Sequence, residues 1–153
     1  MAFLSSMNIV ASGMTAQQLR LDVVAENVTN STTTRTEAGG PYRRKMVVFQ
    51  SVAGRDDFRA AMARAAGGLA PNTGASPAGG VRVTQIVEDP SPMKLVYDPA
   101  HPDANEDGYV EMPNVDMVKE MTDAMAATQT YSANVTAFNT LKSVVAKGLE
   151  IGR

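Results

Sequence analysis

The stretch that decides the fold is residues 114–151, NVDMVKEMTDAMAATQTYSANVTAFNTLKSVVAKGLEI. In it mainly apolar residues recur at spacings of three and four. This spacing places mainly apolar side chains along one side of an α-helix, in the stripe typical of coiled coils. The stripe consists of Met117, Met121, Ala124, Thr128, Tyr131, Val135, Phe138, Lys142, Val145 and Leu149, widened by Val118, Met125, Leu141 and Val144. We therefore predict one long helix, with Asn114 as its N-cap and Gly152 at its end.

A second stripe of the same kind lies near the other end of the chain, in residues 3–30, FLSSMNIVASGMTAQQLRLDVVAENVTN. Its members are Phe3, Met7, Val10, Met14, Gln17, Leu21, Val24 and Val28. At 1.5 Å per residue the two helices would be roughly 40 and 55 Å long, which exceeds the span of a small globular domain. Neither helix can bury its stripe alone. We expect the two to pair as a coiled coil and to leave apolar surface for a further partner.

The segment between the helices predicts short strands and loops. Four stretches indicate β-structure, because they are apolar or alternate between apolar and polar residues: 42–52, 81–89, 93–98 and 108–112. The turn residues Pro90, Ser91 and Pro92 indicate a hairpin between the second and third of these stretches. The spacing of Phe58 and Met62 indicates a short helix within residues 53–66, and residues 67–80, GGLAPNTGASPAGG, are typical of a flexible linker.

These patterns together predict an α+β fold, with long terminal helices paired as a coiled coil and a small β-hairpin segment inserted between them. Residues 1–30 and 113–153 would form one discontinuous helical domain. Residues 31–112 would form an extended stretch and the small β segment, with a flexible insertion at about 52–80.

The composition narrows the range of functions. The formal net charge is −2 and the pI is about 5.4, so no overall field attracts nucleic acid or an anionic membrane. The chain has no Cys, which excludes disulfides and sites built on thiolates. No apolar run reaches about 18 residues, and no positively charged side chain precedes Arg20, so we expect neither insertion into a membrane nor a cleavable secretory signal.

Residues 103–108, DANEDG, are the strongest local candidate for a site, because oxygen ligands at alternate positions followed by Gly begin a calcium-binding loop. The closing position of that loop needs a bidentate Glu but holds Asn114. A turn in which Asp and Asn bind their own backbone is therefore the better interpretation.

Two further groups of polar residues are weaker candidates. His101, the single histidine, has no Cys or second His to complete a zinc site and is expected to pack in a loop. The basic run Arg43–Arg44–Lys45 is divided between two faces if it lies in a strand, which argues against a site for a polyanion. We predict no catalytic residue, no cofactor and no metal.

Three segments resemble the flagellar rod and hook family. They are MNIVASGMTAQQLRLDVVAENVTNSTTTRTEAGGPYRRK (7–45), VEDPSPMKLVYDPAHPDANEDGYVEMPNV (87–115) and YSANVTAFNTLKSVVAKGLEIGR (131–153). The resemblance covers nearly all of the chain outside about residues 52–80, which look like an insertion. Residues 32–45 stand where many members of the family carry a Thr-Pro-Gly turn, a difference that resembles the proximal rod and not the neighbouring rod proteins.

The resemblance implies a structural, non-enzymatic subunit of the proximal rod of the bacterial flagellum, located in the periplasm and exported uncleaved through the flagellar type III apparatus. Its implied partners are further copies and other rod proteins in a helical assembly, together with the membrane-ring and export-gate adaptor at the rod base. The terminal helices would surround the export channel, with polar stripe residues fixing their register: Gln17, Thr128, Asn139 and Lys142.

The residues expected at the assembly interface come from both stripes. They are Met7, Val10, Met14, Leu21, Val24, Val28, Met117, Met121, Met125, Tyr131, Val135, Phe138, Val145 and Leu149. The alternative interpretation is an adaptor protein that forms a closed coiled-coil oligomer, because a small oligomer of fixed size would cover the same stripes.

Overall fold

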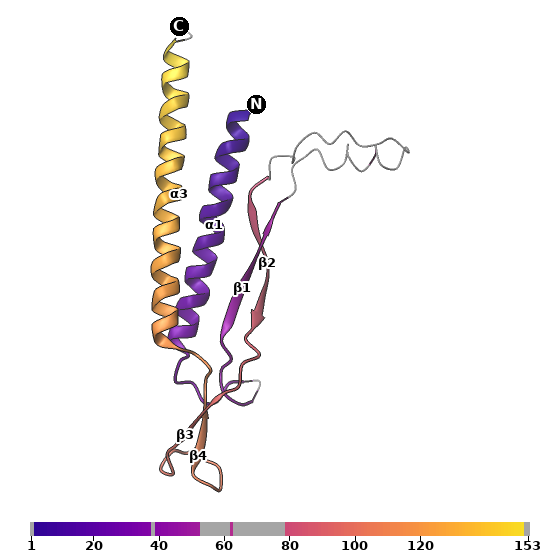
Figure 1. Ribbon diagram of the computed structural model, residues 1–153, viewed down its shortest axis with the longest axis vertical. Helices are drawn as coiled ribbons and strands as arrows, with labels where there is room; N and C mark the ends of the chain where they lie inside the picture. Colours follow the sequence, from indigo (N-terminus) through magenta and orange to yellow (C-terminus); the bar gives the residue numbers. More distant parts are fainter. Residues whose placement is uncertain (1, 38, 53–61, 63–78, 152–153) are drawn as a thin grey trace. The chain divides into compact units, whose positions relative to one another are not determined.

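The computed structural model describes residues 2–37, 39–52, 62 and 79–151. In this part of the chain the order of elements is α1 (Ala2–Thr29), β1 (Lys45–Ser51), β2 (Val81–Glu88), β3 (Lys94–Tyr97), β4 (Tyr109–Met112) and α3 (Met117–Ile151) (Figure 1). The two long terminal helices pack together, with small antiparallel hairpins between them. The predicted α+β fold is thus confirmed. The expected helix in residues 53–66 and the linker at 67–80 lie outside the described residues, apart from Met62, Gly79 and Gly80.

The start of α3 differs from the expectation, because Asn114 does not cap the helix. Asp116 has that role: its Oδ1 accepts a hydrogen bond from Val118 N at 3.0 Å, and its carbonyl accepts one from Glu120 N. Asn114 instead accepts a hydrogen bond from Arg44 N at 2.8 Å and donates to the carbonyls of Asp89 and Ser91. A side chain bound to three backbone groups on other segments cannot also cap the helix.

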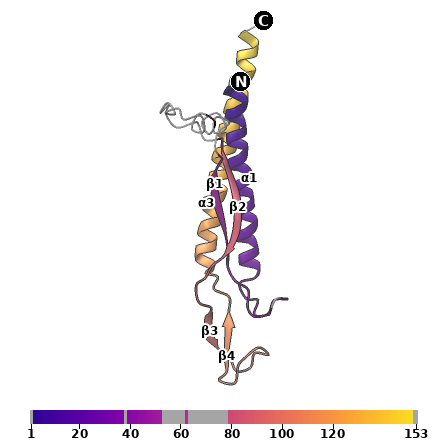
Figure 2. The same ribbon diagram turned by 90° about the vertical axis from the view of Figure 1, so that its right-hand side faces the viewer.

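The strands pair as β1 with β2 and β3 with β4. In the second hairpin Lys94 is opposite Met112 and Tyr97 is opposite Tyr109 (Figure 2). The predicted hairpin between β2 and β3 is therefore wrong. Pro90 and Pro92 have no N–H to donate across a turn, and Asn114 binds the carbonyls on either side of Pro90. The chain consequently passes from one hairpin into the next.

The chain divides into two compact units. The first consists of residues 1–16, 49–84 and 131–153. Here Gly13 of α1 faces α3, since a Cβ on it would lie 3.0 Å from Asn134 Nδ2. The start of β2 also binds α1: Val81 N donates to Ser12 Oγ at 3.0 Å, and Gly80 (φ +112°) has room only for a hydrogen, because a Cβ would lie 2.3 Å from the same oxygen.

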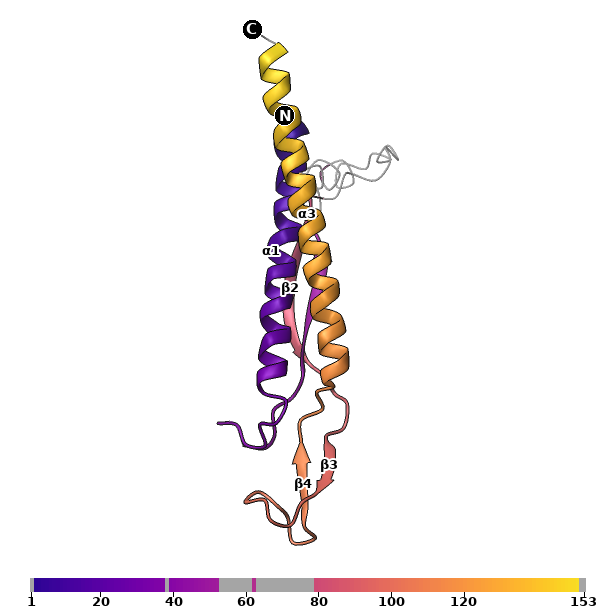
Figure 3. The same ribbon diagram turned by 90° about the vertical axis from the view of Figure 1, so that its left-hand side faces the viewer.

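The second unit consists of residues 17–48 and 85–130. In it the C-terminal half of α1 lies alongside the first turns of α3 (Figure 3). The buried apolar residues of these two helix segments are small: Val23 and Val24 of α1 and Ala127 of α3. The division into a discontinuous helical domain and a separate segment over residues 31–112 stays a prediction.

Candidate functional site

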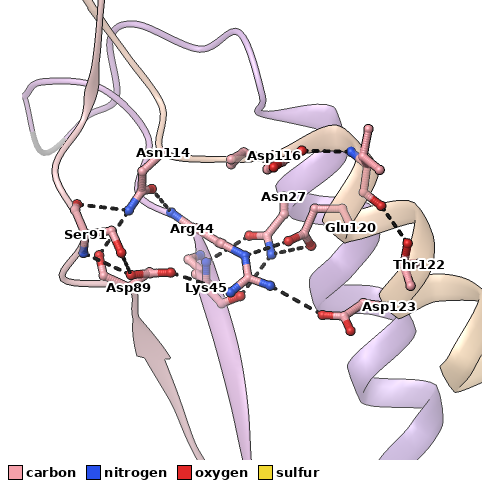
Figure 4. A network of polar contacts seen from close by, with 12 residues as sticks. Asn27, Arg44, Lys45, Asp89, Ser91, Asn114, Asp116, Glu120, Thr122 and Asp123 are labelled. Carbon is pink, nitrogen blue, oxygen red and sulfur yellow. Dashed lines mark hydrogen bonds and ion pairs between the residues drawn. The ribbon is translucent and has the colours of Figure 1, made fainter.

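A buried carboxylate, Glu120, is the centre of a polar cluster in the second unit (Figure 4). Its side chain is 0% exposed. Oε1 accepts a hydrogen bond from Arg44 Nε at 2.6 Å, and Oε2 accepts one from Asn27 Nδ2 at 3.0 Å. A buried carboxylate is tolerated only where charge and hydrogen bonds replace the lost water. Glu120 obtains both, from Arg44, the residue before β1, and from Asn27 of α1.

Asn27, which is also fully buried, ties the end of α1 to β1. Its Nδ2 donates to the Lys45 carbonyl at 2.9 Å, and its Oδ1 accepts from Lys45 N and from the Tyr42 hydroxyl, each at 2.9 Å. Both N–H donors of the Asn27 amide and its oxygen therefore have hydrogen-bond partners. Burial, reinforced by the carboxylates of Glu26 and Glu120, raises the pKa of Tyr42 to about 12.

Arg44 connects Glu120 to the edge of the cluster. Its guanidinium lies 3.4 Å from Asp123 and 3.5 Å from Asp89. Burial lowers the pKa of Arg44, but the hydrogen bond and charge of Glu120 outweigh that effect and raise the pKa above its ordinary value. Hydrogen bonds from Ser91 lower the pKa of Asp89. The cluster joins α1, β1, the segment after β2 and α3 through hydrogen bonds and ion pairs.

An exposed apolar surface lies on another side of the first turns of α3. It consists of Met117, Val118, Met121 and Met125, and we call it the methionine face. These residues are 37%, 73%, 56% and 66% exposed, respectively. Ala127, on the side that contacts α1, is 0% exposed. A helix with apolar side chains on a solvent-facing side is typical of a surface that another molecule covers.

The residues predicted at the assembly interface fall into three groups. Val24 is buried within the chain. Nine are half-buried: Met7, Val10, Met14, Leu21, Val28, Tyr131, Val135, Phe138 and Val145. Met117, Met121, Met125 and Leu149 are exposed. Their contact with another subunit stays a prediction.

The polar residues expected to fix the helix register lie mainly outside the helix contact. Thr128, Asn139 and Lys142 are exposed. Gln17 is half-buried, and its Oε1 has no hydrogen-bond partner within the described residues. Glu120 and Asn27, which do connect the helices, were missed. The apolar repeat could not reveal them, because Glu120 and Ala127, which are two helical turns apart, both lie outside the predicted stripe.

The acidic loop at 103–108 has the geometry of a turn. Asn105 Oδ1 accepts hydrogen bonds from Asp107 N and Tyr109 N, and Gly108 has a positive φ. His101 Nδ1 accepts one from Asp103 N at 3.1 Å. In the part of the chain that the structure describes, no three acidic, His or Cys side chains gather as metal ligands would. The described helices likewise include none with the length and apolar character needed to cross a membrane.

Two family models match the ends of the chain. The model described as "Flagella basal body rod protein" matches residues 7–35, and the model described as "Flagellar basal body rod FlgEFG protein C-terminal" matches residues 106–151. The matched segments contain most of α1 and all of β4 and α3. The class of protein defined by the paired terminal helices is therefore the structural rod protein of the flagellum, which is not an enzyme.

Relatives over the full length make the assignment more specific. The chain is 46% identical to the flagellar basal-body rod protein FlgC of Bacillus subtilis, with 97% of each chain covered. It is 42% identical to the FlgC proteins of Borreliella burgdorferi, over 99% of this chain and 98% of the relative, and of Escherichia coli O6:H1, over 100% of both. The chain belongs to the FlgC family of flagellar basal-body rod proteins. It is a structural subunit of that rod, as the resemblance of its segments to the rod and hook family implied.

Proposed function

We propose that the subunit polymerises through its terminal helices, and that the methionine face is where α3 meets a helix of a neighbouring subunit in the rod. The observation that carries this proposal is the exposure of Met121 and Met125 on a helix whose other side is occupied by α1. Methionine side chains are flexible and polarisable, so one such surface can fit neighbours of somewhat different shape. That property suits a shaft built from several kinds of subunit.

We propose a growing assembly and not a closed pair. In it the methionine face of one subunit meets a different surface of the next, a heterologous contact. Such heterologous contacts propagate helically unless the rotation between subunits closes a ring. We propose accordingly that the subunit forms part of the periplasmic shaft around the export channel, as a discontinuous helical domain made from both ends of the chain.

The same proposal includes the specific binding partners of the subunit. They are further copies, other rod proteins, and the membrane-ring and export-gate adaptor at the base of the rod. The flagellar type III apparatus would deliver the subunit without cleavage. Similarity to rod proteins over the whole chain supports these partners.

The test replaces Met121 with Asp in cells that depend on this subunit. A carboxylate on the methionine face would have to be desolvated when a neighbour covers it, so rods should fail to form while the protein is still produced. The matched control is Thr130→Asp, an exposed position whose hydroxyl bonds only to Ala126 O of its own helix. Motility and rod assembly equal to the parent in Met121→Asp would exclude this surface as an assembly contact.

A second pair of variants tests the helix pairing. Leu21→Asp and Val135→Asp place a charge at half-buried positions of α1 and α3. Both should abolish rod assembly while expression continues. Normal motility in both would refute the role of the paired helices.

A further inference from the structure

The first turns of α3 have two sides that could contact α1, and the structure uses the less apolar one. The apolar pattern favours the side with Met117, Met121 and Thr128, whereas the structure turns Glu120 and Ala127 toward α1. At 3.6 residues per turn, the two sides are separated by a rotation of about 100° around the helix axis.

Hydrophobic packing alone does not explain this choice. The side of α3 that faces α1 supplies the small Ala127 together with the charged Glu120, both 0% exposed. The alternative contact would bury two methionines, and the Thr128 hydroxyl would need no new partner because it already donates to Ala124 O at 2.8 Å. Burial of apolar area therefore favours the alternative.

Fixed polar partners account for the observed choice. Arg44 Nε and Asn27 Nδ2 both aim at the carboxylate of Glu120, and turning α3 would remove that acceptor from them. The Arg44 side chain, which is 17% exposed in the structure, would then lose its shortest ion pair. Buried polar groups of this kind can specify one packing arrangement among several that apolar residues would accept.

We propose that Glu120 is a positioning residue that, through Arg44 and Asn27, selects which side of α3 faces α1 and so keeps the methionine face free for a neighbouring subunit. The selection concerns packing within the chain. Its consequence for assembly rests on the proposed function.

The test removes the cluster without leaving a charge behind, in the double variant Glu120→Leu/Arg44→Met. Since the chain has no Cys, single cysteines report accessibility without interference. Met121→Cys is expected to react rapidly with a maleimide in the parent background, and Ala127→Cys to be protected, as their exposures of 56% and 0% indicate. In the double variant we expect the two to exchange, each rate changing by about tenfold or more.

Any other labelling pattern in the double variant overturns the proposal. Retention of the parental pattern in a helical double variant would show that apolar packing alone holds α3 in place. Reaction at both positions would show that the helices separate instead of turning. Thr122→Ala, at an exposed position of α3 whose hydroxyl donates to Val118 O of its own helix, is the control and should keep the parental pattern. Labelling is measured on the purified full chain and rod assembly in cells, so the packing proposal and the proposed function can fail independently.

Discussion

Replacing Glu120 with Ala is expected to destabilise the second unit by about 3 kcal/mol, because it leaves a buried guanidinium without its main counter-charge. Breaking a buried ion pair by removing one partner typically costs about 3–5 kcal/mol. The lower end applies here for two reasons. Arg44 keeps Asp123 at 3.4 Å and Asp89 at 3.5 Å, and Asn27 Nδ2 keeps the Lys45 carbonyl at 2.9 Å.

Urea unfolding of the purified chain, followed by helical circular dichroism, measures this loss. The midpoint should fall while the slope with denaturant stays the same, since the change affects stability and not the surface exposed on unfolding. Asp123→Ala is the control. Its side chain is 37% exposed, so losing its ion pairs should cost less than about 1 kcal/mol. Equal losses for the two variants would refute the central role assigned to the buried carboxylate.

Two further predictions concern single residues. The raised pKa of Tyr42 means that the folded state resists ionisation of the hydroxyl; its contribution to stability is complete below the ordinary pKa of 10.0 and is lost as the pH rises toward about 12. Tyr42→Phe should therefore show a shallower fall in unfolding free energy over that range, and an unchanged slope would contradict the assignment. Gly80→Ala should destabilise the chain by about 1–3 kcal/mol, because it combines a positive φ with a clash against Ser12. Thermal melting checks this change, with Gly148→Ala, where an added Cβ meets nothing within 4 Å, as the control.

Much of the fold could be predicted from periodicity. Helices α1 and α3 extend over many turns, so a repeat of three and four residues is visible despite polar interruptions such as Gln17. The four strands were also located, since each is a short apolar or alternating run bounded by turn residues.

The pairing of the strands could not be predicted in the same way. Two strands that follow each other across Pro90 and Pro92 look like a hairpin, and the actual partner of β2, β1, lies beyond the intervening residues 52–80. Asn114 shows the same limitation. It has the residue type and position of an N-cap, but its partners are backbone groups brought near only by the folded chain.

The polar cluster was invisible for a related reason. The side of a helix that packs inward is recognised from the spacing of its apolar side chains. A charged residue such as Glu120 is assigned to the solvent side unless its hydrogen-bond donors are known. Those donors, Arg44 and Asn27, lie in a basic run and in an Asn-rich helix end, where each has an ordinary local explanation.

The bond between Asn27 and Glu120 has a consequence for the timing of folding, since it spans 93 positions of the sequence. Contacts between distant positions form late, because the intervening chain must first lose entropy to bring its ends together. If the subunit is exported as proposed, threaded through a narrow conduit as an extended chain, it cannot make this bond until both residues have emerged. The tie that orders the terminal helices would therefore form at the place of arrival and not on the way there.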